Sequence, residues 1–320
     1  MSLCNAKKKV AVIGANGFLG LSISKALCEN GYSVYGLIRN SKSKYQEKYN
    51  NLKIKTFKVG NLEEIKHINL KGIKFDYIIN LAARAHVTKK ISLNSEKIIK
   101  SFTNIEKNIV NNFDAKNTKL IQLSSAKVKL KEKQIKISSN ELVYINAKLK
   151  SEKIIQKNFK KYIILRPPLI YGPYVKANFL NLMRIVKLGI PLPFLNLNNK
   201  RSYLYIKNLV NFILEVLKKD YFNNNSYYIC DGNPASTKKI SDLIAKNFSK
   251  KPLYFYINKK LLKIIGIIFK KEDILNKLIG DFVIDNSKIK KDFGWSPKYN
   301  LNTGIKNTCF WYKTMFKMKR

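Results

Sequence analysis

Cysteine is scarce in this 320-residue chain, and long apolar runs are missing. The four cysteines are scattered without the spacing of metal ligands, so we predict reduced thiols in a cytoplasm and no metal site. A membrane-spanning helix needs roughly 18 to 20 consecutive apolar residues. The nearest approach, Leu261–Phe269, is short and is interrupted by Lys263, so no membrane span is expected. The polar first ten residues lead straight into an apolar strand, which predicts no secretory signal.

Acidic residues and arginine are also few. The chain has 62 lysines and arginines against 20 acidic residues, a formal net charge of +42, and only six of the 62 are arginine. A nucleic-acid-binding surface concentrates its charge on one element and is rich in arginine, whereas these lysines are spread over the whole length. We therefore expect no specific nucleic-acid partner. The positive field favours an anionic substrate instead.

The most informative stretch is Val10–Gly20. Here an apolar strand is followed by glycines at positions 14, 17 and 20 and by a helical pattern that begins near Phe18. A backbone without side chains at a helix N-terminus lets a pyrophosphate approach closely, and the free N–H groups and the helix dipole favour its charge. A glycine-rich turn without a ligand is the alternative, which the position between a strand and a helix disfavours. We predict a dinucleotide-binding loop.

The order of apolar segments predicts an α/β fold with a doubly wound parallel sheet of Rossmann type. Near-continuous apolar strands that alternate with helices are typical of a sheet covered on both faces. Strands are expected at Lys9–Ile13, Tyr32–Ile38, Lys53–Val59, Phe75–Leu81, Thr118–Ser124 and Lys161–Leu165. Helices are expected at Phe18–Asn30, Leu62–Ile68, Leu93–Asn112 and Glu141–Phe159, and a lysine-rich loop at Lys127–Ser139.

The pattern loosens after residue 168, which indicates a second domain. We expect residues 1–168 to form the dinucleotide-binding domain and residues 169–320 to form mainly a smaller, mixed α/β substrate-binding lobe. Some segments of the second half are expected to return to the sheet. Helices are expected there near Asn178–Lys187, Ile206–Lys218 and Thr237–Phe248.

A tyrosine and a lysine four positions apart follow on a predicted helix. The i,i+4 spacing of Tyr144 and Lys148 places the phenol and the ammonium on one helix face, where the ammonium favours the phenolate and assists proton transfer. Ser124 and Ser125 end the fifth strand, where a hydroxyl could hold a substrate oxygen. A solvent-exposed helix face is the usual meaning of Tyr-x-x-x-Lys alone. Here the motif follows a glycine loop and a strand that ends in Ser-Ser, and this order along the chain favours a catalytic role.

Together these motifs resemble the extended short-chain dehydrogenase/reductase family, of the NAD-dependent epimerase/dehydratase type, over nearly the full length. Members of this type are sugar-nucleotide epimerases, dehydratases and reductases. The residues that carry the resemblance are Gly14–Gly20, Asn80–Ala83, Ser124-Ser125, Tyr144 with Lys148, Arg166-Pro-Pro with Tyr171-Gly, and Arg201–Ile206.

The resemblance implies a role for each matching residue, and it implies a homodimer. Tyr144 would be the acid/base, Lys148 would also hold the nicotinamide ribose, and Ser125 would orient the substrate. The residues that would bind the dinucleotide are Gly14, Asn16, Gly17, Phe18, Leu19, Gly20, Arg39, Asn61, Leu62, Leu81, Ala82, Ala83, Tyr144 and Lys148. Those that would bind the UDP-sugar substrate are Ser124, Asn178 and Arg201. Asn178 and Arg201 match contacts to the nucleotide diphosphate, which suits a guanidinium fork, although as isolated residues they could be surface or packing residues.

Two departures from the family pattern bear on the chemistry. The dehydratases carry Asp-Glu directly after the catalytic serine or threonine, and this chain has Ala126-Lys127. Without that acid we expect no dehydration. Asn61 stands where many relatives have an aspartate against the adenine, and its amide can still form a hydrogen bond.

Arg39 ends the second predicted strand and bears on the cofactor. An acidic residue there binds the ribose hydroxyls of NAD, whereas an arginine accommodates the 2′-phosphate of NADP. A solvated strand-end arginine is the alternative, so the cofactor is expected to be NADP(H) or NAD(H). A preference for NADPH favours one-way reduction of a keto sugar over the NAD-retaining cycle of an epimerase.

The pattern at residues 124–128, 176–183 and 189–193 resembles the branch that includes UDP-N-acetylquinovosamine dehydrogenases and proteins labelled UDP-glucose 4-epimerases. It implies hydride transfer at C4 of a UDP-linked 4-keto-6-deoxy N-acetylhexosamine, for surface polysaccharide synthesis. The alternatives are a 4-epimerase of UDP-glucose or UDP-N-acetylglucosamine and a non-catalytic dinucleotide-binding protein. The presence of both Tyr144 and Lys148 favours an enzyme.

Overall fold

A computed structural model describes the chain at residues 7–39, 52, 54–64, 67–70, 72–82, 95–133, 135, 137–258, 261 and 278–317. The chain divides into two units, residues 1–166 with 210–228 and residues 167–209 with 229–320. The segment 210–228 thus belongs to the first unit although it follows part of the second.

The first unit is built on a parallel sheet. Its described strands are β1 (Lys9–Ile13), β2 (Ser33–Ile38), β3 (Lys55–Lys58), β4 (Tyr77–Asn80), β5 (Lys119–Leu123), β6 (Tyr162–Arg166) and β9 (Asn225–Tyr228). They lie in the order β3-β2-β1-β4-β5-β6-β9, and each neighbouring pair is parallel. The order runs outward in opposite directions from β1 and β4, which is the doubly wound Rossmann arrangement. The predicted fold class is confirmed.

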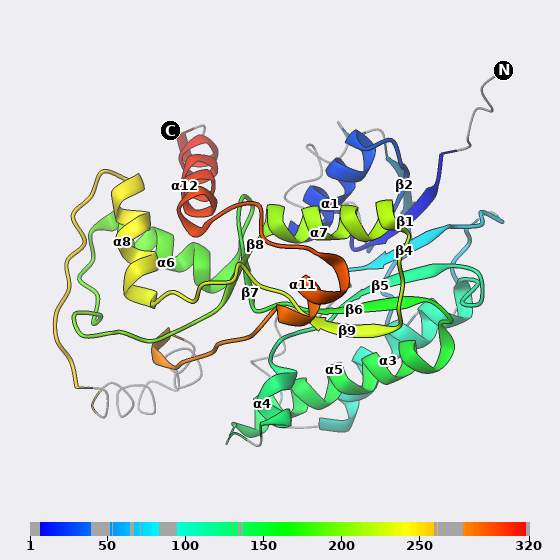
Figure 1. Cartoon of the computed structure of the whole chain (residues 1–320), viewed down its shortest axis with the longest axis horizontal. Coiled ribbons are helices and arrows are strands. Elements are labelled where there is room, and N and C mark those ends of the chain that lie inside the picture. Colours follow the sequence, from blue (N-terminus) through cyan, green and yellow to red (C-terminus); the bar gives the residue numbers. More distant parts are fainter. Residues whose placement is uncertain are drawn as a thin grey trace. The chain divides into compact units, whose positions relative to one another are not determined.

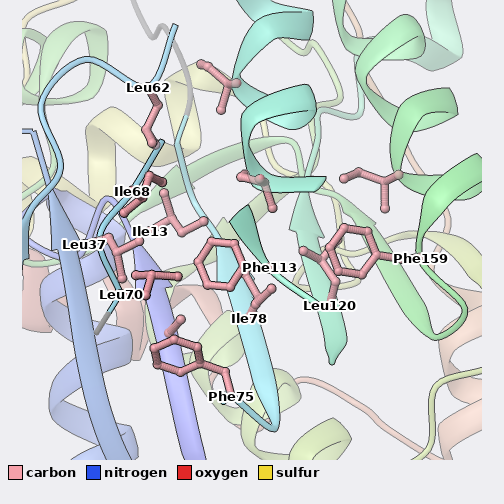
Figure 2. Close-up of a cluster of buried hydrophobic side chains, with 14 of the residues drawn as sticks. Ile13, Leu37, Leu62, Ile68, Leu70, Phe75, Ile78, Phe113, Leu120 and Phe159 are labelled. Carbon is pink, nitrogen blue, oxygen red and sulfur yellow. The ribbon is translucent and has the colours of Figure 1, made fainter. Parts of the chain in front are cut away.

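Helices cover both faces of this sheet (Figure 1). Helix α1 (Phe18–Glu29) lies on one face, and α3 (Ser95–Asn112) and α5 (Ser139–Asn158) pack side by side on the other. Figure 2 shows the apolar side chains buried between the sheet and its cover, among them Ile13, Leu37, Ile78, Phe113 and Phe159. Burying one such side chain stabilises the fold by about 1.5–3 kcal/mol. This core holds the strand ends in fixed positions.

The predicted helix Leu62–Ile68 is wrong. Residues 62–64 form a turn, and residues 67–70 are not helical. The reason lies in α3, where asparagines four residues apart bind this backbone. Asn108 donates to the carbonyl of residue 62 at 2.6 Å, Asn104 donates to that of residue 63 at 3.3 Å, and the amide of residue 68 donates to Asn112 at 2.6 Å. These tertiary hydrogen bonds replace the helical ones.

The predicted loop Lys127–Ser139 also needs a correction, because it contains a short helix, α4 (Val128–Glu132). Contacts of Glu132 with β6 and β9 hold this turn in place, and they are invisible in the local sequence. The other predicted strands and helices of the first unit are confirmed, and their described ends lie within two residues of the predicted ones. Leu93, where one helix was predicted to start, lies outside the described residues.

The second unit contains a small parallel sheet and several helices. Its strands are β7 (Leu169–Tyr171) and β8 (Tyr203–Tyr205). Its helices include α6 (Ala177–Leu188), α8 (Thr237–Asn247), α11 (Ser287–Phe293) and α12 (Leu301–Lys317), and α7 (Ile206–Lys219) begins in it. The three helices predicted in this half are confirmed as α6, α7 and α8. No helix in the described part of the chain is long and apolar enough to cross a membrane.

Asp231 makes the stability of the second unit depend on pH. Its carboxylate accepts hydrogen bonds from the Tyr205 amide at 2.9 Å, from Asn208 Nδ2 at 2.7 Å and from the Tyr171 hydroxyl at 3.2 Å. Burial outweighs these bonds and raises the pKa of Asp231 from 3.8 to about 6. Between these two pH values the folded protein binds more protons than the unfolded chain. The free energy of unfolding therefore falls as the pH rises from about 4 to about 6.

We expect Asp231→Asn to remove this part of the pH dependence, which amounts to about 3 kcal/mol for a shift of about two pH units. Denaturant unfolding of the wild type and the variant over this pH range measures it. The free energy of unfolding of the variant should rise relative to that of the wild type as the pH increases. A difference that stays constant with pH would contradict the role of Asp231.

Candidate active site

Predicted cofactor residues and the predicted substrate residue Ser124 follow the carboxyl ends of strands in the first unit. Gly14 follows β1, Arg39 follows β2, Leu81 follows β4 and Ser124 follows β5. Because these strands are parallel, the residues lie along one edge of the sheet, with the switch point between β1 and β4 among them. Doubly wound sheets bind their ligands at this edge.

The glycine loop is tightly closed. Gly14 has a positive φ of 79° and donates its amide to the Leu37 carbonyl at 2.9 Å. Gly17 precedes the first residue of α1. A Cβ on Gly20 would lie 2.2 Å from the Gly14 carbonyl oxygen and 2.6 Å from Ala15 Cα, so no side chain can be placed there. The loop thus presents bare backbone at a helix N-terminus, which fits the pyrophosphate of a dinucleotide.

Several other predicted cofactor residues keep part of their surface exposed beside this loop. They are Asn16, Phe18, Leu19, Leu81 and Ala82. Arg39 is exposed, and Asn61 is half-buried and donates to Glu64 Oε1 at 2.5 Å. The Leu62 side chain belongs to the buried cluster of Figure 2. Ala83 lies outside the described residues.

Helix α5 carries the predicted catalytic pair. Tyr144 is half-buried, and Lys148 is only 2% exposed. The Tyr144 ring packs edge-on against Phe102 of α3 with ring centres 5.9 Å apart, and Lys148 Nζ lies 5.6 Å from the centre of the same ring. The two side chains therefore lie against the same residue of α3, Phe102. The predicted common face of Tyr144 and Lys148 is present in the structure.

The two serines after β5 have different surroundings. Ser124 is buried and donates its hydroxyl to Glu152 Oε1 at 2.5 Å. Ser125 is half-buried, and its Oγ accepts the Lys127 amide at 3.3 Å. Lys127, in the position where a dehydratase carries an acid, forms an ion pair with Glu141 at 2.5 Å. Ser125 is therefore the more accessible of the two hydroxyls.

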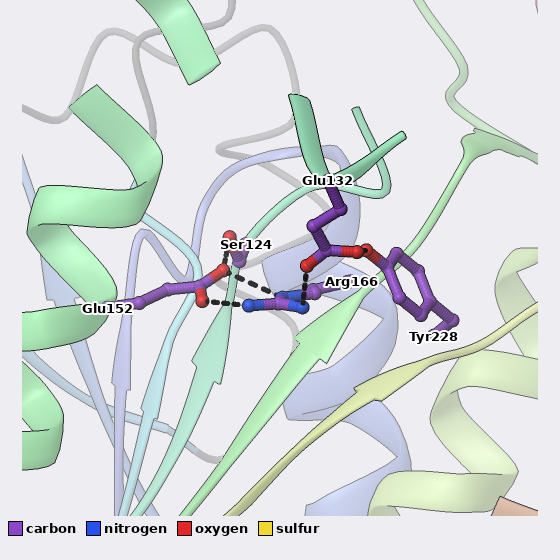
Figure 3. Close-up of polar contacts among 5 residues, drawn as sticks. All are labelled: Ser124, Glu132, Glu152, Arg166 and Tyr228. Carbon is purple, nitrogen blue, oxygen red and sulfur yellow. Dashed lines mark hydrogen bonds and ion pairs between the residues drawn. The ribbon is translucent and has the colours of Figure 1, made fainter. Parts of the chain in front are cut away.

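A charged network includes Ser124 (Figure 3). Arg166 at the end of β6 binds Glu152 through two nitrogens, at 3.1 and 2.6 Å, and binds Glu132 of α4 at 2.9 Å. The Tyr228 hydroxyl of β9 donates to Glu132 at 2.5 Å, and burial together with this bond raises the pKa of Tyr228. Sequence reasoning missed this network. The position of Glu152, four residues after Lys148, was its only signal.

A second buried chain of hydrogen bonds leads from the cofactor edge into the interior. The Ala82 amide donates to Asn80 Oδ1 at 3.0 Å, Asn80 donates to Gln122 at 2.9 Å, and Gln122 donates to Glu106 of α3 at 3.2 Å. Ser151 of α5 also donates to Glu106, at 2.9 Å. Sequence reasoning missed this chain too, although a lone glutamine in an apolar strand could have revealed it.

The second unit contains the two remaining predicted residues. Asn178 is exposed in the first turn of α6. Arg201 is half-buried, donates from Nη1 to the Gly280 carbonyl at 2.6 Å, and lies with Cζ 5.9 Å from the centre of the Phe282 ring. Arg201 therefore has structural contacts within the second unit.

A Rossmann sheet, a side-chain-free loop after β1 and a Tyr–Lys pair on α5 define a dinucleotide-dependent enzyme of the extended short-chain dehydrogenase/reductase type. The chain belongs to the NAD dependent epimerase/dehydratase family, whose model matches residues 10–230. NAD is accordingly its cofactor class.

Similar proteins support this assignment. The chain is 30% identical over 319 residues to a UDP-glucose 4-epimerase of Vibrio cholerae, with 94% of each chain covered. The fold is similar to that of a Thermotoga maritima UDP-glucose 4-epimerase solved with UDP-glucose, at a TM-score of 0.70 and 20% identity over 96% of this chain and 99% of that one. It is also similar to a Bacillus anthracis dTDP-glucose 4,6-dehydratase in complex with NAD, at a TM-score of 0.69 and 17% identity over 96% and 97%.

Proposed function

We propose that the protein catalyses hydride transfer at C4 of a UDP-linked sugar, and that it reduces the C4 ketone of a 4-keto-6-deoxy N-acetylhexosamine. The observation that carries the proposal is that Tyr144 and Lys148 of α5 both lie against the Phe102 ring of α3. A bound nicotinamide dinucleotide supplies the hydride. The family and the name of the V. cholerae relative support a UDP-sugar as substrate.

In this proposal each residue of the first unit has a defined task. The Tyr144 phenol donates a proton to the C4 oxygen as the carbonyl becomes an alcohol. The Ser125 hydroxyl donates a hydrogen bond to the same oxygen and orients it. The Lys148 ammonium stabilises the phenolate that Tyr144 leaves behind. Lys127 supplies no carboxylate for the elimination of water, which separates this chemistry from that of a dehydratase.

The second unit would bind the nucleotide part of the substrate. We propose that Asn178 and Arg201 contact the diphosphate, since a guanidinium suits a diphosphate and the net charge of +42 attracts an anion. The exposed Arg39 would contact the 2′-phosphate of NADPH.

A second candidate is a UDP-hexose 4-epimerase, which the name of the V. cholerae relative favours. The same Tyr144, Lys148 and Ser125 serve this reaction, because oxidation at C4 reverses the proton transfer of the reduction. The two candidates differ in whether reduced cofactor is consumed.

The test is a panel of UDP-hexoses and 4-keto UDP-sugars with NADH and with NADPH. We expect consumption of the reduced cofactor with a 4-keto UDP-sugar and a C4 alcohol as product, with NADPH preferred if Arg39 acts as proposed. Absorbance of the reduced nicotinamide and stereochemical analysis of the product measure it. Turnover of a UDP-hexose without added cofactor and without an absorbance change would replace the reductase by the epimerase.

A further inference from the structure

Glu106 is a buried carboxyl group that the proposed mechanism leaves without a task. The residue is 2% exposed in the middle of α3. Ser151 of α5 and Gln122 of β5 donate to its two oxygens at 2.9 and 3.2 Å. A buried carboxylate costs free energy unless hydrogen bonds and an opposite charge compensate its lost hydration. Its place in the interior therefore calls for a positively charged neighbour.

Lys148 is the neighbour that meets this requirement. Its Nζ lies over the ring of Phe102, which is one helical turn before Glu106 on α3. Ser151, which binds Glu106, is three residues after Lys148 on α5. The ammonium and the carboxyl group thus share the buried strip between α3 and α5. Burial raises the pKa of Glu106 above its ordinary value, and the charge of Lys148 and the hydrogen bonds of Ser151 and Gln122 offset part of this rise.

The described groups that bind Glu106 from the sheet side carry no charge. Gln122 of β5 binds Glu106 and is itself bound by Asn80 of β4, which accepts the Ala82 amide at the cofactor edge. These amides satisfy one carboxylate oxygen without neutralising it. The electrostatic partner among the described residues is therefore Lys148, on the opposite side.

We propose that Glu106 is a positioning residue whose carboxylate is the counter-charge of the Lys148 ammonium, holding it between α3 and α5 beside Tyr144. The inference rests on the proposed function, because it takes Lys148 to act at the reacting end of the cofactor. Glu106 acts through Lys148 and touches neither substrate nor cofactor.

Glu106→Gln tests this role because glutamine keeps the size and one acceptor oxygen but removes the charge. Removing a buried negative charge disfavours positive charge close to it. We expect the alkaline limb of the kcat/KM profile to move to lower pH by about one unit. At the pH of the wild-type alkaline limb, kcat/KM of the variant should then be about tenfold lower than that of the wild type. Fluorescence titration with NADH should show the same displacement in the pH dependence of the Kd.

Three control variants separate the charge from packing. Glu106→Asp keeps the charge on a shorter side chain, so it should retain the wild-type pH profile even if it unfolds at lower temperature. Ser151→Ala removes one hydrogen bond to Glu106 and leaves the charge. Glu96→Gln removes an exposed charge from the same helix. Both should also keep the wild-type profile.

A Glu106→Gln variant with wild-type pH dependence of kcat/KM and of NADH affinity overturns the proposal. A Glu106→Asp variant whose pH profile shifts as far as that of Glu106→Gln also overturns the proposal. If the wild type turns over no UDP-sugar at all, the proposed function fails on its own. The NADH titration then still decides the role of Glu106.

Discussion

Tyr144→Phe is expected to lower kcat by about 10²- to 10⁴-fold, because the substitution removes the proposed proton donor and nothing else. Phenylalanine keeps the edge-on contact with Phe102 at 5.9 Å and the ring over which Lys127 Nζ lies at 5.6 Å. The fold and the NADH affinity should therefore stay close to those of the wild type. Steady-state kinetics with the 4-keto UDP-sugar, together with thermal unfolding and NADH titration, measure all three quantities.

Tyr221→Phe is a suitable control for this experiment. Tyr221 also belongs to the first unit, but 47% of its surface is exposed and it follows α7, away in sequence from the proposed site. Loss of the Tyr221 hydroxyl should leave kcat unchanged. A Tyr144→Phe variant that retains more than about a tenth of the wild-type kcat would show that another group donates the proton.

The sheet could be predicted from the sequence because its strands are buried on both faces. Continuous apolar segments such as Val10–Ile13 are typical of a parallel sheet that is covered on both faces, and their alternation with helices favours this arrangement. The glycine loop could also be predicted, since a pyrophosphate site requires backbone without side chains directly after a strand. The common face of Tyr144 and Lys148 follows from helix geometry alone.

What could not be predicted depends on contacts between distant segments. Residues 62–68 have a helical pattern, yet the asparagines of α3 bind their backbone more than 40 residues away. The helix α4 depends on the binding of Glu132 to Arg166 and Tyr228. Glu106 and Glu152 resemble ordinary charged residues on helix surfaces until the opposite helix or strand is placed against them.

Helix α5 shows how these buried contacts support the proposed chemistry. Along it, Tyr144, Lys148 and Glu152 follow one another at intervals of four residues, so successive turns carry the proposed acid, its ammonium and the ligand of Arg166. Glu152 binds both Ser124 and Arg166, and thereby ties α5 to the ends of β5 and β6. Ser125, the next residue after Ser124, thus follows a strand end that is bound to the helix that carries Tyr144.

The second large effect is expected for Gly20→Ala, which should destabilise the fold by about 3 kcal/mol and abolish NADH binding. Gly20 lies within α1, where alanine is ordinarily more favourable than glycine by about 1 kcal/mol. Here the new methyl group would lie 2.2 Å from the Gly14 carbonyl oxygen and 2.6 Å from Ala15 Cα. These are backbone atoms, so the loop between β1 and α1 must open, and the amides that would bind the pyrophosphate move with it.

Gly17→Ala provides the graded comparison, because a Cβ on Gly17 would lie 3.2 Å from the Gly14 carbonyl oxygen, a contact that a shift of a few tenths of an ångström relieves. Denaturant unfolding should therefore give a much lower free energy of unfolding for Gly20→Ala than for Gly17→Ala. NADH titration should likewise give a much weaker affinity for Gly20→Ala. If Gly20→Ala instead gained the stability that alanine gives to an ordinary helix and kept its NADH affinity, the loop would not be closed as tightly as its backbone contacts require, and its role as the pyrophosphate site would lose its physical basis.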